Sequence, residues 1–201
     1  PLTGDTALKC GRNHCFDRAK EVYWHLLPVQ SMRTKAPGDS KEMVAARRAF
    51  LNAGYYGIFG RALGELCLAY GASAGADAPL HLLDAADLLL NCFSPFAQEE
   101  FRRVLRPGGR MIYVVPGAEH LYQMKAVLYD TPYKNPVQEV AYEGFRPIGE
   151  REVSGRITVP AGQLEALFAM TPYYWKTPRD GAARLAALPE LTTDISFRFL
   201  V

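Results

Sequence analysis

The sequence predicts an α/β fold with a mostly parallel β-sheet, and three neighbouring segments carry this prediction. An apolar run over residues 88–93 has the length of a strand that is buried on both faces. Apolar residues at helical spacing follow over residues 96–105, and a second apolar run covers residues 111–115. Strand, helix and strand in this order form a βαβ unit, so we expect the two strands to be parallel.

Two proline-containing turns bound the predicted helix. Pro95 suits its first turn, where the missing backbone N–H would have no partner in any case. The Pro-Gly-Gly stretch at residues 107–109 is expected to end it. Ligands of such sheets bind beyond the carboxyl ends of the strands, which places residues 91–95 and 116–120 on the expected functional rim. The alternative is an α/β domain whose rim loops have no special role.

Length, composition and charge limit the classes of protein to which this chain can belong. The chain has 201 residues, of which 49% are hydrophobic, so it can form one domain with a substantial core and a small appendage. A net charge of +2 is too small to indicate a nucleic-acid partner by itself. No apolar run reaches the roughly 18–20 residues that a membrane helix needs, and no signal peptide is recognisable, so we expect a cytoplasmic protein. The chain begins at Pro1 without an initiator Met, which leaves open whether residues precede it.

The four cysteines are not spaced like a disulfide framework. Cys67 and Cys92 lie in apolar stretches and are expected to be reduced core residues. Cys10 and His14 flank a short turn that contains Gly and Asn, so a thiolate and an imidazole can converge on one tetrahedral ion. Only Cys15 remains nearby as a further ligand. The alternatives are therefore half of a zinc site and a reduced cysteine beside an exposed histidine.

Residues 17–41 mix basic side chains with aromatic rings, and Arg33 and Lys35 belong to this stretch. The pattern suits RNA, because phosphates attract Lys and Arg while unstacked bases lie on aromatic rings. The alternative is a solvated charged surface over a small core.

A helix is expected over residues 39–52, because Asp39 and Glu42 form a start like a capping box. Arg47 and Arg48 are adjacent on it, so their side chains point about 100° apart and do not form one clamp. The remaining expected elements are helices over residues 57–70, 120–128 and 160–170, strands within 145–159 and over 193–201, and a loop over 129–136.

Several short motifs, taken together, carry a family resemblance. The segment from residue 88 to residue 117 resembles the second half of a Rossmann-like S-adenosylmethionine-dependent methyltransferase. The wider set of motifs resembles the bacterial 23S ribosomal RNA guanine-N1 methyltransferases, in the family's order and over nearly the whole chain. These motifs are Phe-Asp-Arg-Ala-Lys-Glu at 16–21, Leu-Leu-Pro-Val-Gln at 26–30, Pro-Gly-Asp-Ser at 37–40, Arg-Arg-Ala-Phe-Leu at 47–51 and Met-Thr-Pro-Tyr-Tyr-Trp at 170–175.

The resemblance implies a Rossmann-like methyltransferase domain over residues 36–201, preceded by a small zinc-ribbon-like RNA-recognition module over residues 1–35. It implies methylation of guanine N1 in a hairpin of 23S ribosomal RNA, with S-adenosylmethionine as methyl donor and zinc as a bound metal. Homodimers occur in this family, and one of its branches is associated with macrolide resistance. An antiparallel strand at the sheet edge is typical of this methyltransferase class.

Individual site residues follow from the family's positions. The resemblance assigns two zinc ligands to Cys10 and His14, and two cofactor contacts to Tyr56 and His120. The residues expected to contact RNA are Asn91 and Pro95, which match the post-strand position where related enzymes hold the target base, and the basic residues Arg33, Lys35, Arg47 and Arg48.

Two features of the family are absent from this sequence. The family's Cys-x-x-Cys pair would lie upstream of Cys10, before the chain begins. The cofactor loop, Asp-x-Gly-Cys-Gly-x-Gly, has no counterpart, because only residues 71–84 separate a predicted helix from the strand at residue 88, whereas one βαβ unit takes roughly 30 residues. We therefore expect a missing segment between about residues 78 and 84. As written, the chain would bind S-adenosylmethionine poorly.

Guanine N1 carries a proton, so methyl transfer needs a base or a hydrogen bond to O6. Glu119, His120 and Asp130 are the candidates by their position on the rim. The alternative function is a non-catalytic RNA-binding or ribosome-assembly protein that lacks the cofactor site. A small-molecule methyltransferase is a third interpretation. Cofactor binding separates the first two, and salt-dependent RNA affinity tests the third.

Overall fold

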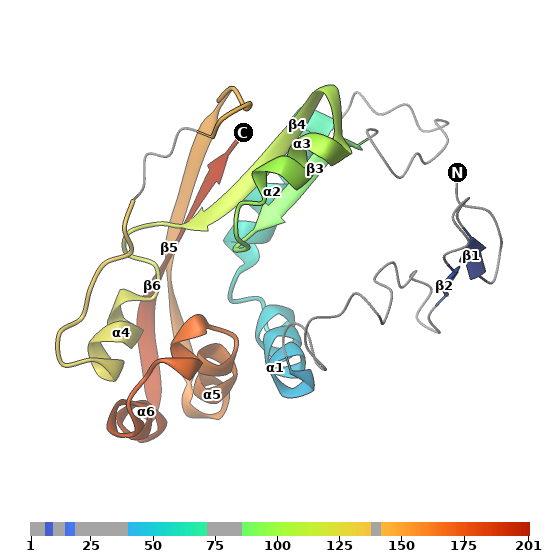
Figure 1. Ribbon diagram of the computed structural model, residues 1–201. Coiled ribbons are helices and arrows are strands. Elements are labelled where there is room, and N and C mark those ends of the chain that lie inside the picture. The colour runs from blue at the N-terminus through green and yellow to red at the C-terminus, as the bar shows by residue number, and fades with distance from the viewer. Residues whose placement is uncertain (1–6, 10–14, 19–39, 72–85, 138–141) are drawn as a thin grey trace. The chain divides into compact units, whose positions relative to one another are not determined.

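The computed structural model describes residues 7–9, 15–18, 40–71, 86–137 and 142–201 (Figure 1). The chain divides into two compact units, Pro1–Val44 and Ala45–Val201, which are described separately below. The expected domain boundary after residue 35 lies outside the described residues and stays a prediction.

The first unit contains a two-stranded antiparallel sheet. Strand β1 (Ala7–Lys9) pairs with β2 (Cys15–Asp17), with Leu8 opposite Phe16 and Lys9 opposite Cys15. The turn that the sequence predicts between these strands lies outside the described residues. Cys10 and His14, the expected zinc ligands, lie outside the described residues.

Two helices follow, α1 (Lys41–Asn52) and α2 (Gly57–Gly71). The backbone N–H of Met43 donates to the Ser40 hydroxyl at 3.2 Å, so Ser40 caps α1. Asp39, the expected start of this helix, lies outside the described residues. Helix α2 confirms the helix that was expected over residues 57–70.

A four-stranded sheet of order β3-β4-β6-β5 forms the centre of the second unit. Its strands are β3 (Ala86–Cys92), β4 (Leu105–Pro116), β5 (Glu150–Pro160) and β6 (Glu190–Leu200). Strands β3 and β4 are parallel and are joined by α3 (Gln98–Val104), which confirms the predicted βαβ unit and the α/β class.

The antiparallel strand is not at the sheet edge, and that expectation is corrected. Strand β6 runs antiparallel to both β4 and β5 and lies between them, so β5 is the edge. Their side chains explain the order. In β6, Ile195, Phe197 and Phe199 are almost completely buried, whereas β5 exposes alternate residues, as suits an edge strand.

The Pro-Gly-Gly stretch also differs from its expected role. Helix α3 ends at Val104, and residues 107–109 already lie within β4. Gly108 has a φ of 79°, which favours glycine, and a Cβ on Gly109 would lie 2.8 Å from the carbonyl oxygen of Ala86. These glycines therefore let β4 approach β3 at the register shift between Ala86 and Leu88.

The ladder of β5 and β6 is longer than the rest of the sheet. It runs from Glu150 opposite Leu200 to Pro160 opposite Glu190, whereas β4 pairs with β6 only as far as Pro116 opposite Phe197. Short helices gather around its extended end (Figure 1). They are α4 (Tyr122–Leu128), α5 (Ala161–Ala169), the 3-10 helix η2 (Pro172–Trp175) and α6 (Arg179–Ala186), of which η2 and α6 were not predicted.

One hydrophobic core holds this unit together. It joins the inner face of the sheet to the helices, and each of its fully buried large side chains stabilises the fold by about 1.5–3 kcal/mol. Its completely buried members include Phe50, Ile112, Val114, Met124, Leu128, Leu167, Phe197 and Phe199. No helix in the described part of the chain is both long and apolar enough to span a membrane.

Candidate functional site at the sheet rim

The carboxyl ends of β3 and β4 lie side by side, so the segments that follow them form one rim, as the sequence predicts. Phe93 follows β3 with a φ of 57°, and Leu121 follows the β4 loop with the same value. They are the two non-glycine residues with positive φ among those described. This conformation costs about 1–2 kcal/mol per residue, so two such positions at one rim indicate a functional constraint there.

A buried pair of side chains lies at this rim. The Tyr56 hydroxyl and Nε2 of His120 are 3.2 Å apart, and both residues are less than 10% exposed. Tyr56 comes from the residues between α1 and α2, whereas His120 comes from the loop after β4. The structure therefore brings together the two residues that were assigned to the cofactor, from positions 64 apart in the chain.

Hydrogen bonds assign the tautomer of His120. The backbone N–H of Ser196 donates to Nδ1 at 3.2 Å, so Nδ1 is the acceptor and Nε2 carries the proton. Nε2 then donates to the Tyr56 oxygen, which leaves the tyrosine proton available to another acceptor. Burial lowers the pKa of His120 to about 4, and the nearby Lys125 charge acts in the same direction. Burial also raises the pKa of Tyr56. Both side chains are uncharged at neutral pH.

Aromatic rings surround this pair. The ring of Phe197 lies 4.9 Å from both Tyr56 and His120 between centroids, in edge-to-face contacts. Phe93 lies 6.1 Å from His120 and is 46% exposed, so it forms the outer, solvent-facing member of the group. The site thus combines two neutral polar groups with apolar ring surfaces at the edge of the core.

The loop that carries His120 is fixed to β6. The backbone N–H of Gly117 donates to the Ser196 carbonyl at 2.9 Å, and that of Leu121 donates to the Asp194 carbonyl at 2.8 Å. A Cβ on Gly117 would lie 2.0 Å from the Ser196 hydroxyl oxygen, so the close approach requires glycine at this position. These bonds hold His120 at a fixed place relative to the sheet.

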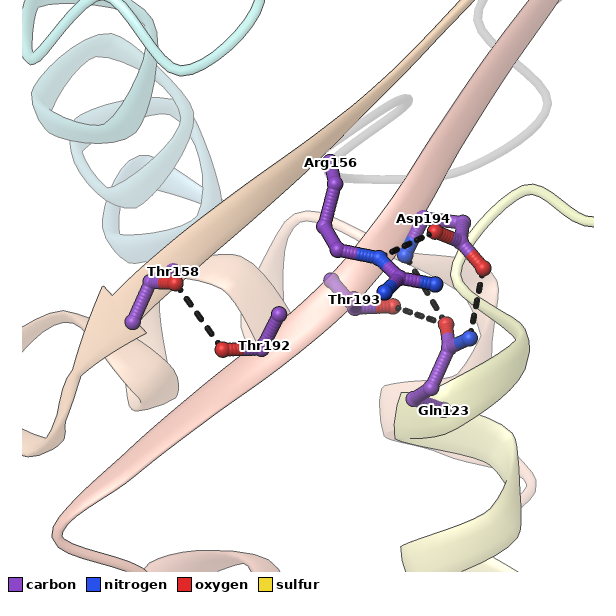
Figure 2. A network of polar contacts seen from close by, with 6 residues as sticks. All are labelled: Gln123, Arg156, Thr158, Thr192, Thr193 and Asp194. Carbon is purple, nitrogen blue, oxygen red and sulfur yellow. Dashed lines mark hydrogen bonds and ion pairs between the residues drawn. The ribbon is translucent and has the colours of Figure 1, made fainter.

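Gln123 of α4 makes a second attachment to β6, which Figure 2 shows. Its Oε1 accepts from the backbone N–H of Asp194 at 2.8 Å and from the Thr193 hydroxyl at 3.0 Å, while its Nε2 donates to the Asp194 carboxylate at 2.6 Å. Arg156 of β5 donates to the same carboxylate at 2.8 Å. The network therefore connects α4, β6 and β5 next to the loop that carries His120.

Lys125 is completely buried and holds the segment after α4. Its Nζ donates to the Asn135 side-chain oxygen at 2.6 Å and to the Tyr133 carbonyl at 3.1 Å, and it lies 4.5 Å from the Tyr133 ring centroid. Asn135 in turn donates to the carbonyls of Gly117 and His120 at 2.9 and 3.1 Å. Residues 129–136, the loop expected to border the substrate pocket, are therefore bonded to the loop of His120.

Asn91 and Pro95 lie on the rim as predicted, with a local structural role. Asn91 is buried, and its side-chain amide donates to the carbonyls of Ser94 and Pro95 at 3.4 and 3.3 Å. This amide shapes the turn that leads into α3. Whether these residues hold a target base stays a prediction.

The candidates for the general base lie in different surroundings. Glu119 forms an ion pair with Lys134 at 2.5 Å and is partly exposed. Asp130 is largely exposed and pairs with Arg184 of α6 at 3.2 Å. The geometry of His120 argues against that role, because one ring nitrogen accepts from the backbone and the other carries a proton.

The expected RNA contacts are placed only in part. Arg47 and Arg48 lie on α1, where Arg47 is half-buried and Arg48 is exposed. Arg33 and Lys35, like the segment between residues 78 and 84, lie outside the described residues. Sequence reasoning missed Gln123, Lys125 and Ser196, whose contacts come from segments distant in the chain.

Comparisons with known proteins identify the family. Residues 2–35 match the family model described as RlmA, N-terminal, a zinc ribbon. A protein of Micromonospora griseorubida, provisionally named a 23S rRNA (guanine-N(1)-)-methyltransferase, is 30% identical over an alignment that covers 93% of this chain and 86% of the relative. The 23S rRNA (guanine(748)-N(1))-methyltransferase of Streptomyces fradiae is 27% identical over 97% of this chain and 91% of its own length.

These findings define a Rossmann-like methyltransferase fold with an N-terminal zinc-ribbon sequence. The chain belongs to the 23S rRNA (guanine-N(1)-)-methyltransferase family. The first alignment spans 258 positions against 201 residues in the chain, so more than 50 positions of that relative have no counterpart here.

The rim residues provide one side of a site for S-adenosylmethionine. The neutral Tyr56–His120 pair and the exposed ring of Phe93 offer hydrogen bonds and an apolar face to an adenosine or sulfonium group. The opposite side, the glycine-rich loop, has no counterpart in this sequence. For zinc, no cluster of three potential ligands occurs among the described residues, and Cys15 there is exposed.

Proposed function

We propose that this protein methylates N1 of a guanine in 23S ribosomal RNA, with S-adenosylmethionine as the methyl donor. The observation that carries the proposal is the Tyr56–His120 pair at the rim of a chain that belongs to this family. A ribosomal RNA substrate places the activity in the cytoplasm. We also propose a hairpin of that RNA as the target and a homodimer as the working form, as the resemblance implies.

The residues of the chain have separate parts in this reaction. Tyr56 and His120 would hold the cofactor, which supplies an electrophilic methyl group when bound. Asn91, Pro95 and the exposed ring of Phe93 would hold the guanine next to it, so that N1 lies in line with the methyl group. Glu119 is the favoured acceptor of the N1 proton, because it lies in the same loop as His120 and keeps a partly exposed carboxylate.

The first unit would recognise RNA through a bound zinc ion. Cys10 and His14 are the proposed ligands in this chain, within the segment that matches the zinc-ribbon model. Arg33, Lys35, Arg47 and Arg48 would contact the RNA backbone. Metal analysis of the Cys10→Ser and His14→Ala variants tests this assignment, and loss of bound zinc in both would support it. Full zinc content in both variants would contradict it.

Cofactor titration tests the proposal against its rival, a non-catalytic RNA-binding protein. Calorimetric titration of S-adenosylmethionine into the protein should show saturable binding, and the His120→Asn variant should bind at least about tenfold more weakly. His25→Asn is the matched control, because that histidine belongs to the first unit and is not assigned to the cofactor. RNA binding without any cofactor binding would favour the rival, since the missing segment would then have removed catalysis.

A further inference from the structure

A cavity with a volume of about 1030 Å³ lies among the described residues, away from the His120 rim. It is bounded by the amino-terminal half of β4, the first residue of β5 and the last residues of β6. Because β6 is antiparallel to its neighbours, these parts meet at the end of the sheet opposite to the end where Pro116 lies. Arg110 and Pro116 are six positions apart along β4, which corresponds to about 20 Å.

Arginine dominates the charge of this cavity. Its lining includes Arg102, Arg106, Arg110, Arg146 and Arg198, and Glu150 is the acidic side chain among the described lining residues. We call it the arginine groove. Arg198 donates to Glu150 at 2.7 Å, and Arg106 pairs with Asp87.

Among the described residues, three of these arginines have no carboxylate partner. Within the part of the chain that the structure describes, Arg102, Arg110 and Arg146 form no ion pair with a carboxylate. Arg110 lies over the Tyr70 ring, 5.2 Å from its centroid, which orients the guanidinium and leaves its charge in place. The groove therefore keeps a net positive charge even though Arg198 and Arg106 are paired with carboxylates.

The groove is held in shape by packing. Gly144 has a φ of 81°, and a Cβ at this position would lie 2.9 Å from Nε of Arg102, so the backbone rests directly on that guanidinium group. The rings of Tyr142 and Phe145 stand 4.3 and 5.6 Å from the ring of Phe96, between centroids. This aromatic cluster fixes the segment that carries Arg146 against the turn that leads into α3.

We propose that the arginine groove binds the phosphodiester backbone of the RNA that the protein methylates. The inference rests on the proposed function and names a second contact surface for the same substrate. Guanidinium groups bind phosphate oxygens in bidentate pairs, and the Tyr142 and Phe145 rings in the lining provide apolar surface beside them for unstacked bases. The groove would contact RNA about 20 Å from the methylated guanine.

Salt-dependent RNA binding tests this inference. The variant Arg102→Gln/Arg146→Gln removes two exposed, unpaired cations, and Arg61→Gln/Arg179→Gln is the matched control, because both of its sites are exposed and lie outside the groove. The affinity of each protein for a 23S ribosomal RNA fragment is measured between 0.05 and 0.5 M salt. Two lost phosphate contacts should reduce the slope of log K against log salt by about 1.4–1.8, which weakens binding more than tenfold at low salt. The control should keep the wild-type slope.

Each result has a definite meaning. Equal slopes for the groove variant and the wild type would overturn the inference, while methyl transfer by the wild type would leave the proposed function in place. Inorganic phosphate, tested as a competitor, distinguishes an RNA site from a site for a small anion. Binding of phosphate alone, with an unchanged RNA slope, would also overturn the inference. A wild-type protein that neither binds RNA nor transfers methyl groups would overturn the groove and the proposed function together.

Discussion

The backbone N–H of Ser196 and Nδ1 of His120 form a hydrogen bond of 3.2 Å that joins the antiparallel strand β6 to the rim loop after β4. The same serine residue accepts from the Gly117 backbone through its carbonyl and donates to Glu152 of β5 through its hydroxyl at 2.8 Å. One residue of β6 therefore sets the position and the tautomer of the histidine on which the proposed cofactor site depends.

Removal of the Tyr56 hydroxyl should weaken both the fold and the site. In Tyr56→Phe, the proton on Nε2 of His120 loses its buried acceptor, which we expect to cost about 1–3 kcal/mol in the free energy of unfolding. Tyr174→Phe is the control, because Tyr174 is 44% exposed. Urea denaturation measures both variants. A loss of stability in Tyr56→Phe no larger than in the control would show that the hydrogen bond is not important.

Stability should fall in mild acid because of His120. Its pKa of about 4 in the folded protein lies below the ordinary value near 6.5, so the unfolded chain binds a proton more readily between these values. The stability that the neutral imidazole contributes is fully present above pH 6.5. It is lost as the pH falls toward 4, and the loss in unfolding free energy amounts to about 3 kcal/mol. The difference in unfolding free energy between wild type and His120→Asn should narrow over that range. A constant difference would contradict the assignment of a neutral, buried imidazole.

A methyl group at Gly117 should disrupt the rim loop. Gly117→Ala places a Cβ 2.0 Å from the Ser196 hydroxyl oxygen, so the loop or β6 has to move, and we expect a loss of about 2–4 kcal/mol. Gly162→Ala in α5 is the matched control, because nothing lies within 4 Å of its Cβ position, and it should stabilise by up to about 1 kcal/mol. Thermal unfolding of the two variants should thus give shifts of opposite sign.

Loss of the buried cation at Lys125 should release the segment after α4. In Lys125→Met, the Asn135 side chain and the Tyr133 carbonyl lose the ammonium group that donates to both of them inside the protein. We expect the free energy of unfolding to fall by about 1–3 kcal/mol and amide exchange over residues 129–137 to become faster. Lys134→Met breaks only an exposed pair with Glu119 and should have a smaller effect on stability than Lys125→Met. Similar exchange rates in the two variants would show that Lys125 does not hold this segment.

The local pattern of the sequence was sufficient for the parallel βαβ unit. The apolar runs of β3 and β4 and the helical spacing between them are short-range features, and the rim at their ends follows from the topology. The place of β6 between β4 and β5 was not predictable, because its partners lie 30 to 50 positions away in β5 and 81 to 87 positions away in β4. It also depends on the burial of Phe197 and Phe199, which only the tertiary fold provides.

In the site, too, some residues could be predicted from the sequence and others could not. Tyr56 and His120 were found through family positions, and the structure joins them by a hydrogen bond. The partners that hold them, Ser196, Gln123 and Lys125, carry no motif. The residues next to Ser196 and Lys125 in the sequence give no sign that these two side chains are buried. Only the tertiary fold buries them beside the rim. Their roles follow from contacts that no local pattern encodes.

Methyl transfer itself is the most direct test of the central claim. A fragment of 23S ribosomal RNA is incubated with this protein and S-adenosylmethionine carrying a labelled methyl group, and the digested RNA is analysed for N1-methylguanosine. Our account predicts label on guanine N1, and a sharp decrease of that label in the His120→Asn variant. Binding of the RNA without any label at N1, by a protein that is folded and zinc-loaded, would contradict the assignment of this chain as a methyltransferase.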